Sequence, residues 1–106
     1  MVDYLNYDGK KLPIKISFSA LNAFEKETGL TMSKIGEELK NHEIILWYAL
    51  KAGHYKAKEE FKIEREEVEW ILDECLGQYQ KIFMDSMIKL QSDLVGGVEE
   101  ASKKKK

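Results

Sequence analysis

The sequence predicts an α+β domain, mainly α, in which an N-terminal β-hairpin precedes a small bundle of about four to five helices. An Asp-Gly turn separates two alternating segments near the start of the chain, and helical spacing of apolar residues dominates the rest. The 106 residues are 43% hydrophobic, which suits one domain with one modest core. We expect a single globular domain at residues 1–95 (hairpin 2–18, helical bundle 19–95) and a disordered Gly/Lys tail at residues 96–106.

The hairpin is predicted from its turn. Asp8-Gly9 favours a type I′ turn, because both residues tolerate the positive φ angles that this turn requires. The turn pairs Tyr7 with Lys10, Leu5 with Leu12, and Asp3 with Ile14. One face then carries the apolar side chains of Leu5, Tyr7, Leu12, Ile14 and Ile16. Pro13 cannot donate to a ladder, so it should lie at a sheet edge or a bulge.

The first three helices are predicted from caps and glycines. Ser17 or Ser19 caps the first, which Gly29 ends after Thr28. A short second helix should carry Ile35 and Leu39. The third helix spans residues 44–52, with Asn41 as its cap and Gly53 as its end, and residues 54–62 form a loop. The third helix is apolar on nearly every side, which predicts a place in the middle of the bundle.

The C-terminal half has two apolar stripes. The first stripe runs from Val68 to Leu76, after which Gly77 should break or kink the chain. The second stripe belongs to a last long helix that Gly96-Gly97 should end, and it consists of Tyr79, Phe83, Met87, Leu90 and Leu94.

Charge and hydropathy narrow the function classes. Lys103–Lys106 supply four of the 17 basic residues, so residues 1–102 hold 13 basic and 19 acidic residues, a formal charge of −6. A domain with this negative net charge is electrostatically unsuited to bind nucleic acid, which requires a basic surface. The longest apolar run, residues 44–50, is far below the roughly 18 residues of a membrane span. The single cysteine, Cys75, fits a reducing cytoplasm.

No catalytic, cofactor or metal site is predicted. His42, His54 and Cys75 have no spacing typical of zinc ligands, and Cys75 lies on an apolar stripe that disfavours a thiolate. A dense set of carboxylates near a predicted helix N-terminus indicates a solvated helix face. The set comprises Glu66, Glu67, Glu69, Asp73 and Glu74. No phosphate-binding loop occurs. We therefore expect a protein that is not an enzyme and has no small-molecule substrate.

Binding to another protein has better support. Trp70 falls about 200° around its helix from Val68, away from the first stripe. The last helix has a second apolar line with Met84, Ile88 and Val95, which is either a broadened core face or a partner surface. The expected partner-binding residues are Trp70, Met84, Met87, Ile88 and Tyr4. The open edge of the hairpin also invites self-association by strand addition, giving a homo-oligomer.

Four segments carry a resemblance to a known family. They are residues 12–21 (Leu-Pro-Ile-Lys-Ile-Ser-Phe-Ser-Ala-Leu), residues 24–29 (Phe-Glu-Lys-Glu-Thr-Gly), residues 46–54 (Leu-Trp-Tyr-Ala-Leu-Lys-Ala-Gly-His), and residues 61–68 before an acidic helix. In this order, over roughly residues 4–92, the chain resembles the tail assembly chaperones of long-tailed bacteriophages, particularly those of Gram-positive hosts. No binding motif of that family can be transferred residue by residue.

The resemblance implies a non-enzymatic protein of the host bacterial cytoplasm. Such proteins are thought to bind the tape-measure protein, to help recruit tail-tube subunits, and to be absent from the finished virion. Many have a longer form made by ribosomal frameshifting, and Lys103–Lys106 are compatible with an adenine-rich slippery run there. The alternatives are a small phage-encoded DNA-binding regulator and a structural head–tail joining protein.

Overall fold

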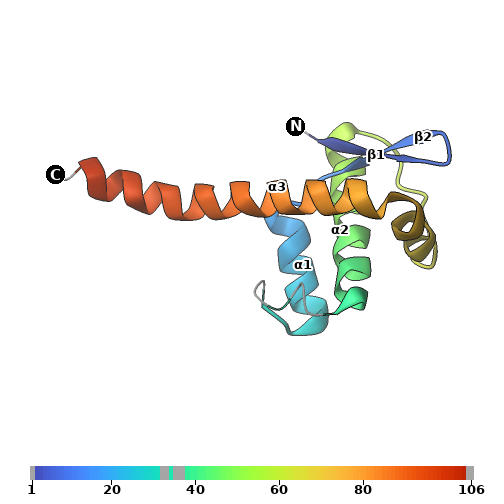
Figure 1. Ribbon diagram of the computed structural model, residues 1–106, viewed down its shortest axis with the longest axis horizontal. Coiled ribbons are helices and arrows are strands. Elements are labelled where there is room, and N and C mark those ends of the chain that lie inside the picture. The colour runs from blue at the N-terminus through green and yellow to red at the C-terminus, as the bar shows by residue number, and fades with distance from the viewer. Residues whose placement is uncertain (1, 32–33, 35–37, 105–106) are drawn as a thin grey trace.

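Three helices and one hairpin make up the fold (Figure 1). The computed structural model describes residues 2–31, 34 and 38–104. In chain order the elements are β1 (Asp3–Tyr7), β2 (Lys10–Ile14), α1 (Phe18–Thr28), α2 (Leu39–Ala57) and α3 (Glu67–Lys104). The predicted class, mainly helical with an N-terminal antiparallel hairpin, is confirmed. Within the described residues there are three helices rather than four to five.

The hairpin has the predicted register. Leu5 lies opposite Leu12, and Asp8 and Gly9 both have positive φ, 50° and 73°. Leu5 and Ile14 are fully buried, so the predicted apolar face is the one that meets the core. Pro13 lies opposite Tyr4, in the alternating set of pairs whose backbone N atoms point away from the partner strand, so its missing N–H removes no ladder bond.

The hairpin ends before residue 18, because α1 begins there. Ser17 is the cap of α1, and its Oγ accepts a hydrogen bond from the Ala20 N–H at 3.3 Å. Gly29 ends the helix in the left-handed region, with φ 74°, and its N–H donates to the Glu25 carbonyl at 2.8 Å. Both boundaries of α1 agree with the sequence prediction.

The predicted bounds of α2 are wrong at both ends. The helix begins at Leu39 and ends at Ala57, with Lys58 in the left-handed region. Asn41 is not a cap: it is buried inside the first turn, and its Nδ2 donates to the Lys34 carbonyl at 3.2 Å. His54, expected in a loop, lies in the helix and bonds the Leu50 carbonyl at 2.7 Å through Nδ1. Ile35 of the predicted short helix lies outside the described residues, and Leu39 belongs to α2.

Gly53 serves packing and does not end the helix. A Cβ at this position would lie 2.5 Å from backbone atoms of Pro13 and Ile14. The close approach is reinforced next to it, where the Lys15 N–H donates to the Ala49 carbonyl at 2.9 Å. The glycine therefore lets β2 lie directly on α2.

One helix, α3, replaces the two that were predicted. Its backbone leaves helical geometry at Cys75 (φ −115°, ψ 20°) and not at Gly77, which is exposed with open space around it. The Cys75 thiol is buried against β1 and donates to the Asn6 carbonyl at 3.1 Å, which gives the bend a local partner. The helix also passes through Gly96-Gly97, so the tail predicted at residues 96–106 contains helical backbone up to Lys104. Alanine, glutamate and lysine after the glycines are strong helix formers.

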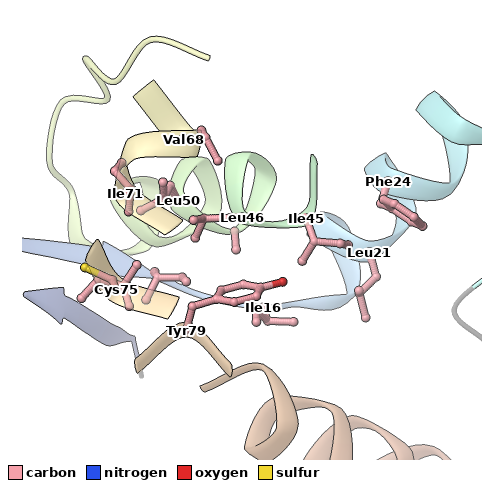
Figure 2. Close-up of a cluster of buried hydrophobic side chains, with 13 residues drawn as sticks. Ile16, Leu21, Phe24, Ile45, Leu46, Leu50, Val68, Ile71, Cys75 and Tyr79 are labelled. Atoms are coloured by element: carbon pink, nitrogen blue, oxygen red, sulfur yellow. The ribbon is translucent and has the colours of Figure 1, made fainter. Parts of the chain in front are cut away.

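The core lies between the hairpin and the three helices. As predicted, α2 is the central element and contacts β2, α1 and α3. Figure 2 shows the Tyr79 ring of α3 among Ile16, Ile45 and Leu46, which come from the segment after β2 and from α2. Tyr79 is fully buried, as are Phe24 and Ile71. In Figure 1 the C-terminal half of α3 projects from this body, and the molecule measures 52 × 28 × 23 Å. Among the described residues, no helix combines the length and apolar character that crossing a membrane requires.

Candidate partner-binding groove

A groove of about 630 Å³ lies between the start of α2 and the first turns of α3. Both helices supply its walls, and the loop that joins them brings residues about 30 positions apart in the chain onto one surface. The lining residues are Leu39, His42, Glu43, Glu69, Trp70, Leu72, Asp73, Leu76, Tyr79 and Gln80.

Three large apolar side chains of the groove are open to solvent. Leu39 is 85% exposed, Trp70 64% and Leu76 46%. The exposure of Trp70 agrees with its predicted position opposite Val68, which is buried. Leu76 was predicted on the buried stripe, and this is wrong. It lies about 80° from Val68 on a regular helix, at the margin of the stripe, and the bend at Cys75 comes just before it.

Three carboxylates stand beside this apolar surface: Glu43 on α2, and Glu69 and Asp73 on α3. Burial, then the charge of Glu69 and a hydrogen bond shared with it, raises the pKa of Glu43. Within the described part of the chain, no ion pair joins any of the three to a lysine or arginine. The charge of Glu69 therefore acts on Glu43 with no lysine or arginine paired to either carboxylate among the described residues.

The floor of the groove is neutral. Tyr79 Oη lies 2.9 Å from His42 Nδ1. Burial raises the pKa of Tyr79, so its hydroxyl keeps its proton at neutral pH and shares a hydrogen bond with His42. Burial also lowers the pKa of His42, whose ring forms T-shaped pairs with Tyr79 and Phe83, with centroids 5.6 and 5.2 Å apart. None of the described residues that line the groove is cationic at neutral pH.

The five predicted partner-binding residues do not form one surface. Trp70 lies in the groove, whereas Met84 and Ile88 are exposed farther along α3 and do not line it. Met87 is half-buried and packs against the core, and Tyr4 is partly exposed on β1. The residues that the sequence did not single out for binding are Leu39, Glu43 and Leu76, together with Glu69 and Asp73 of the carboxylate set. Glu69, Trp70, Asp73 and Leu76 follow one another at spacings of one, three and three, which is the signal that places them together on α3.

The outer edge of β1 is covered near the turn by side chains of α3. The Asn6 N–H donates to Gln78 Oε1 at 2.9 Å, and Gln78 Nε2 donates to the Asn6 carbonyl at 3.3 Å. The Asp8 N–H donates to Glu74 Oε2 at 2.7 Å. The expectation of an open edge is therefore wrong at these positions, because α3 side chains take the bonds that an added strand would make.

Arg65 holds the segment before α3 against the other helices. Its guanidinium forms an ion pair with Glu27 of α1 and lies over the rings of Trp47 and Tyr48, 5.7 and 5.8 Å from their centroids. Tyr48 Oη also donates to Glu27 at 2.8 Å. These contacts place the start of α3, and with it Glu69 and Trp70, beside α2.

The described residues hold no group of three or more histidine, cysteine or acidic side chains that could hold a metal ion. Comparisons of the chain with protein-family models, with curated proteins and with solved structures find no match. What the groove offers chemically is accessible apolar surface bordered by carboxylates that have no lysine or arginine partner among the described residues, which is the character of a binding surface.

Proposed function

We propose that this protein is a non-enzymatic tail assembly chaperone of a long-tailed bacteriophage. It acts in the cytoplasm of the host bacterium, binds the tape-measure protein, helps recruit tail-tube subunits, and is absent from the mature virion. The resemblance over roughly residues 4–92 supports this role. So does the mainly helical fold with an N-terminal hairpin, which is the architecture that the resemblance leads one to expect.

The observation that carries the proposal is the exposed apolar groove between α2 and α3. A chaperone must hold apolar segments of a client reversibly, so it needs apolar surface that its own fold leaves open and charges that keep it soluble. Leu39, Trp70 and Leu76 supply the surface, and the flanking carboxylates supply the charge.

Co-expression with the tape-measure protein of the same phage tests the proposal. We expect the two proteins to copurify, and we expect purified phage particles to lack the chain. A chain found in the particles at a fixed copy number would favour a head–tail joining protein instead. Retention on heparin at physiological salt, without copurification of the tape-measure protein, would favour a DNA-binding regulator.

A longer second form belongs to the same proposal. Adenine-only codons for Lys103–Lys106 would let the ribosome slip by one base into an overlapping frame. Sequencing the gene tests this, because lysine codons interrupted by guanines, or a shifted frame that closes within a few codons, would contradict it. Peptides of a longer product in infected cells would support it.

A further inference from the structure

The charges of the groove have a defined spacing. Glu69 and Asp73 are four residues apart on α3, so they point to the same side and are separated by about 6 Å along the helix axis. Glu43 reaches the groove from α2 and stands beside Glu69. The groove thus has one position with two carboxylates and, about one helical turn away, a second position with one carboxylate.

Exposed apolar side chains flank this charged row. On a helix with 100° per residue, Glu69 and Asp73 fall in direction between Leu76 and Trp70, which are about 9 Å apart along α3, and Leu39 lines the same groove from the start of α2. Apolar side chains on both sides of a charged row, spaced by about two helical turns, suit an amphipathic helix laid along α3. A helix is also the segment that needs no backbone partners from the groove, whose walls are helices with satisfied backbones.

The occupant must bring positive charge. The three carboxylates have no lysine or arginine partner among the described residues, and His42 at the floor is neutral. An apolar segment without cations would bury these carboxylates unpaired, at a large desolvation cost. An acidic segment would add repulsion.

We propose that the groove binds an amphipathic helix of the partner protein that carries two lysine or arginine residues four positions apart, flanked by apolar side chains. One cation lies over Glu43 and Glu69, the other lies over Asp73, and the apolar side chains contact Leu39, Trp70 and Leu76. The inference rests on the proposed function in that it takes the partner to be the tape-measure protein, and it specifies which segments of that protein are bound.

Synthetic helical peptides test the chemistry directly. The first carries leucines along one face and lysines at i and i+4 beside them. The second has the same composition with the lysines at i and i+2, which point to different faces. The third has glutamates in place of the lysines. Fluorescence anisotropy of the labelled peptides with the full-length protein at physiological salt should give the first peptide an affinity at least about tenfold above the other two. Equal binding of the first and second peptides would overturn the inference.

Charge reversal in the groove gives the matched comparison. Glu69→Lys should weaken binding of the first peptide at least about tenfold and strengthen binding of the glutamate peptide. Asp93→Lys, the same charge change on an exposed position of α3 outside the groove, should leave both affinities within about twofold. Equal effects of the two variants would show a general charge attraction and would overturn the inference. Circular dichroism of both variants establishes that they are folded.

Two further outcomes separate this inference from the proposed function. If Glu69→Lys and Leu76→Asp still copurify with the tape-measure protein as well as the wild type does, the groove inference fails and the proposed function stands. If the lysine peptide binds with the predicted specificity but the tape-measure protein does not copurify, the proposed function fails and the chemistry of the groove stands. Self-association of the wild-type protein that Glu69→Lys abolishes would assign the groove to a second copy and overturn the inference.

Discussion

Two helical glycines show how much the surroundings of a single residue decide. Gly53→Ala should lower the free energy of unfolding by about 2 kcal/mol or more, because the new Cβ would meet the backbone of Pro13 and Ile14 at 2.5 Å. Gly77→Ala should raise it by up to about 1 kcal/mol, because the position is helical with open space around it. Urea unfolding of both variants measures the contrast. Equal changes of the same sign would show that β2 does not lie on α2 as described.

The Glu43 carboxylate should reduce stability while it supports binding. A carboxyl whose pKa is raised in the folded state stabilises the fold below its ordinary value of 4.5, and this contribution is lost as the pH rises through the raised pKa. Glu43→Gln should therefore raise the stability at pH 7 by less than about 1 kcal/mol, since the side chain is partly solvated. The gain should disappear below pH 4.5, and binding of the lysine peptide should weaken. A variant that is less stable at pH 7 would contradict the repulsion between Glu43 and Glu69.

His42 gives a pH dependence of the opposite sign. Burial lowers its pKa below the ordinary value of 6.5, so the fold has its full stability above pH 6.5 and loses part of it as the pH falls through the window below. The free energy of unfolding should decrease between pH 7 and pH 5.5 in the wild type and decrease less in His42→Gln, whose amide does not titrate. The same slope in both proteins would mean that other groups are responsible.

At the scale of elements, the sequence predictions were confirmed where turn and capping residues set the ends of an element. The hairpin register follows from Asp8-Gly9, and the ends of α1 follow from Ser17 and Gly29, which act through their own backbone and nearest neighbours. The bounds of α2 were wrong because Asn41 and Gly53 serve contacts with Lys34 and with β2, which only the folded chain reveals. The bend of α3 lies at Cys75 for the same reason.

Only part of the groove could be predicted from the sequence, because its two walls come from different helices. The angle between Trp70 and Val68 on one helix placed Trp70 at the surface, and the structure agrees. Leu39 and Glu43 come from a different helix, and no pattern within one element shows that α2 and α3 bring them beside Glu69. The carboxylates of α3 were visible in the sequence, but their meaning depends on the apolar side chains across the groove.

The cover that α3 provides for β1 leads to a prediction about association. Removing the Glu74 and Gln78 side chains, in the double variant Glu74→Ala/Gln78→Ala, leaves the Asn6 and Asp8 N–H groups free to pair with another strand. Sedimentation velocity should show association that grows with concentration and a loss of about 1–2 kcal/mol in stability. The control Gln91→Ala/Asp93→Ala also removes one amide and one carboxylate side chain, here from exposed positions of α3. Its association and stability should match those of the wild type. Identical behaviour of the two double variants would mean that the edge needs no cover.

At the scale of the whole molecule, α3 separates the proposed binding groove from the C-terminal end of the helix. The N-terminal half of this helix builds the core and one wall of the groove, whereas its C-terminal half projects from the body (Figure 1). Lys103 and Lys104 are separated from Asp73 of the groove by about 30 helical residues, or about 45 Å along α3. A partner bound in the groove as proposed would therefore lie far from the C-terminal end of α3.

This separation predicts where the chain tolerates change. Among the residues whose burial the structure describes, which end at Asp93, the last fully buried side chain is Tyr79 and the last that packs on the core is Leu90. Deleting residues 96–106 should therefore change the midpoint of thermal unfolding by less than about 2 °C, which corresponds to a change of less than about 0.5 kcal/mol in the free energy of unfolding for a domain of this size. The affinity for the lysine peptide should stay unchanged. Deleting residues 82–106 removes Ile82, Phe83, Met87 and Leu90 from the core surface and should cost at least about 3 kcal/mol.

The pair of deletions also bears on a longer form of the protein. If residues 96–106 contribute nothing to folding or to the groove, a domain fused to the C-terminal end would be attached to a helix that projects away from the core and the groove (Figure 1). The fusion would then require no change in the packing of the core. A folded domain fused there should leave the thermal midpoint of the body and the peptide affinity as they are, measured by calorimetry and anisotropy. A large loss of stability or affinity on fusion, or on the shorter deletion, would mean that the projecting half of α3 folds back onto the body, and the separation along α3 would be wrong.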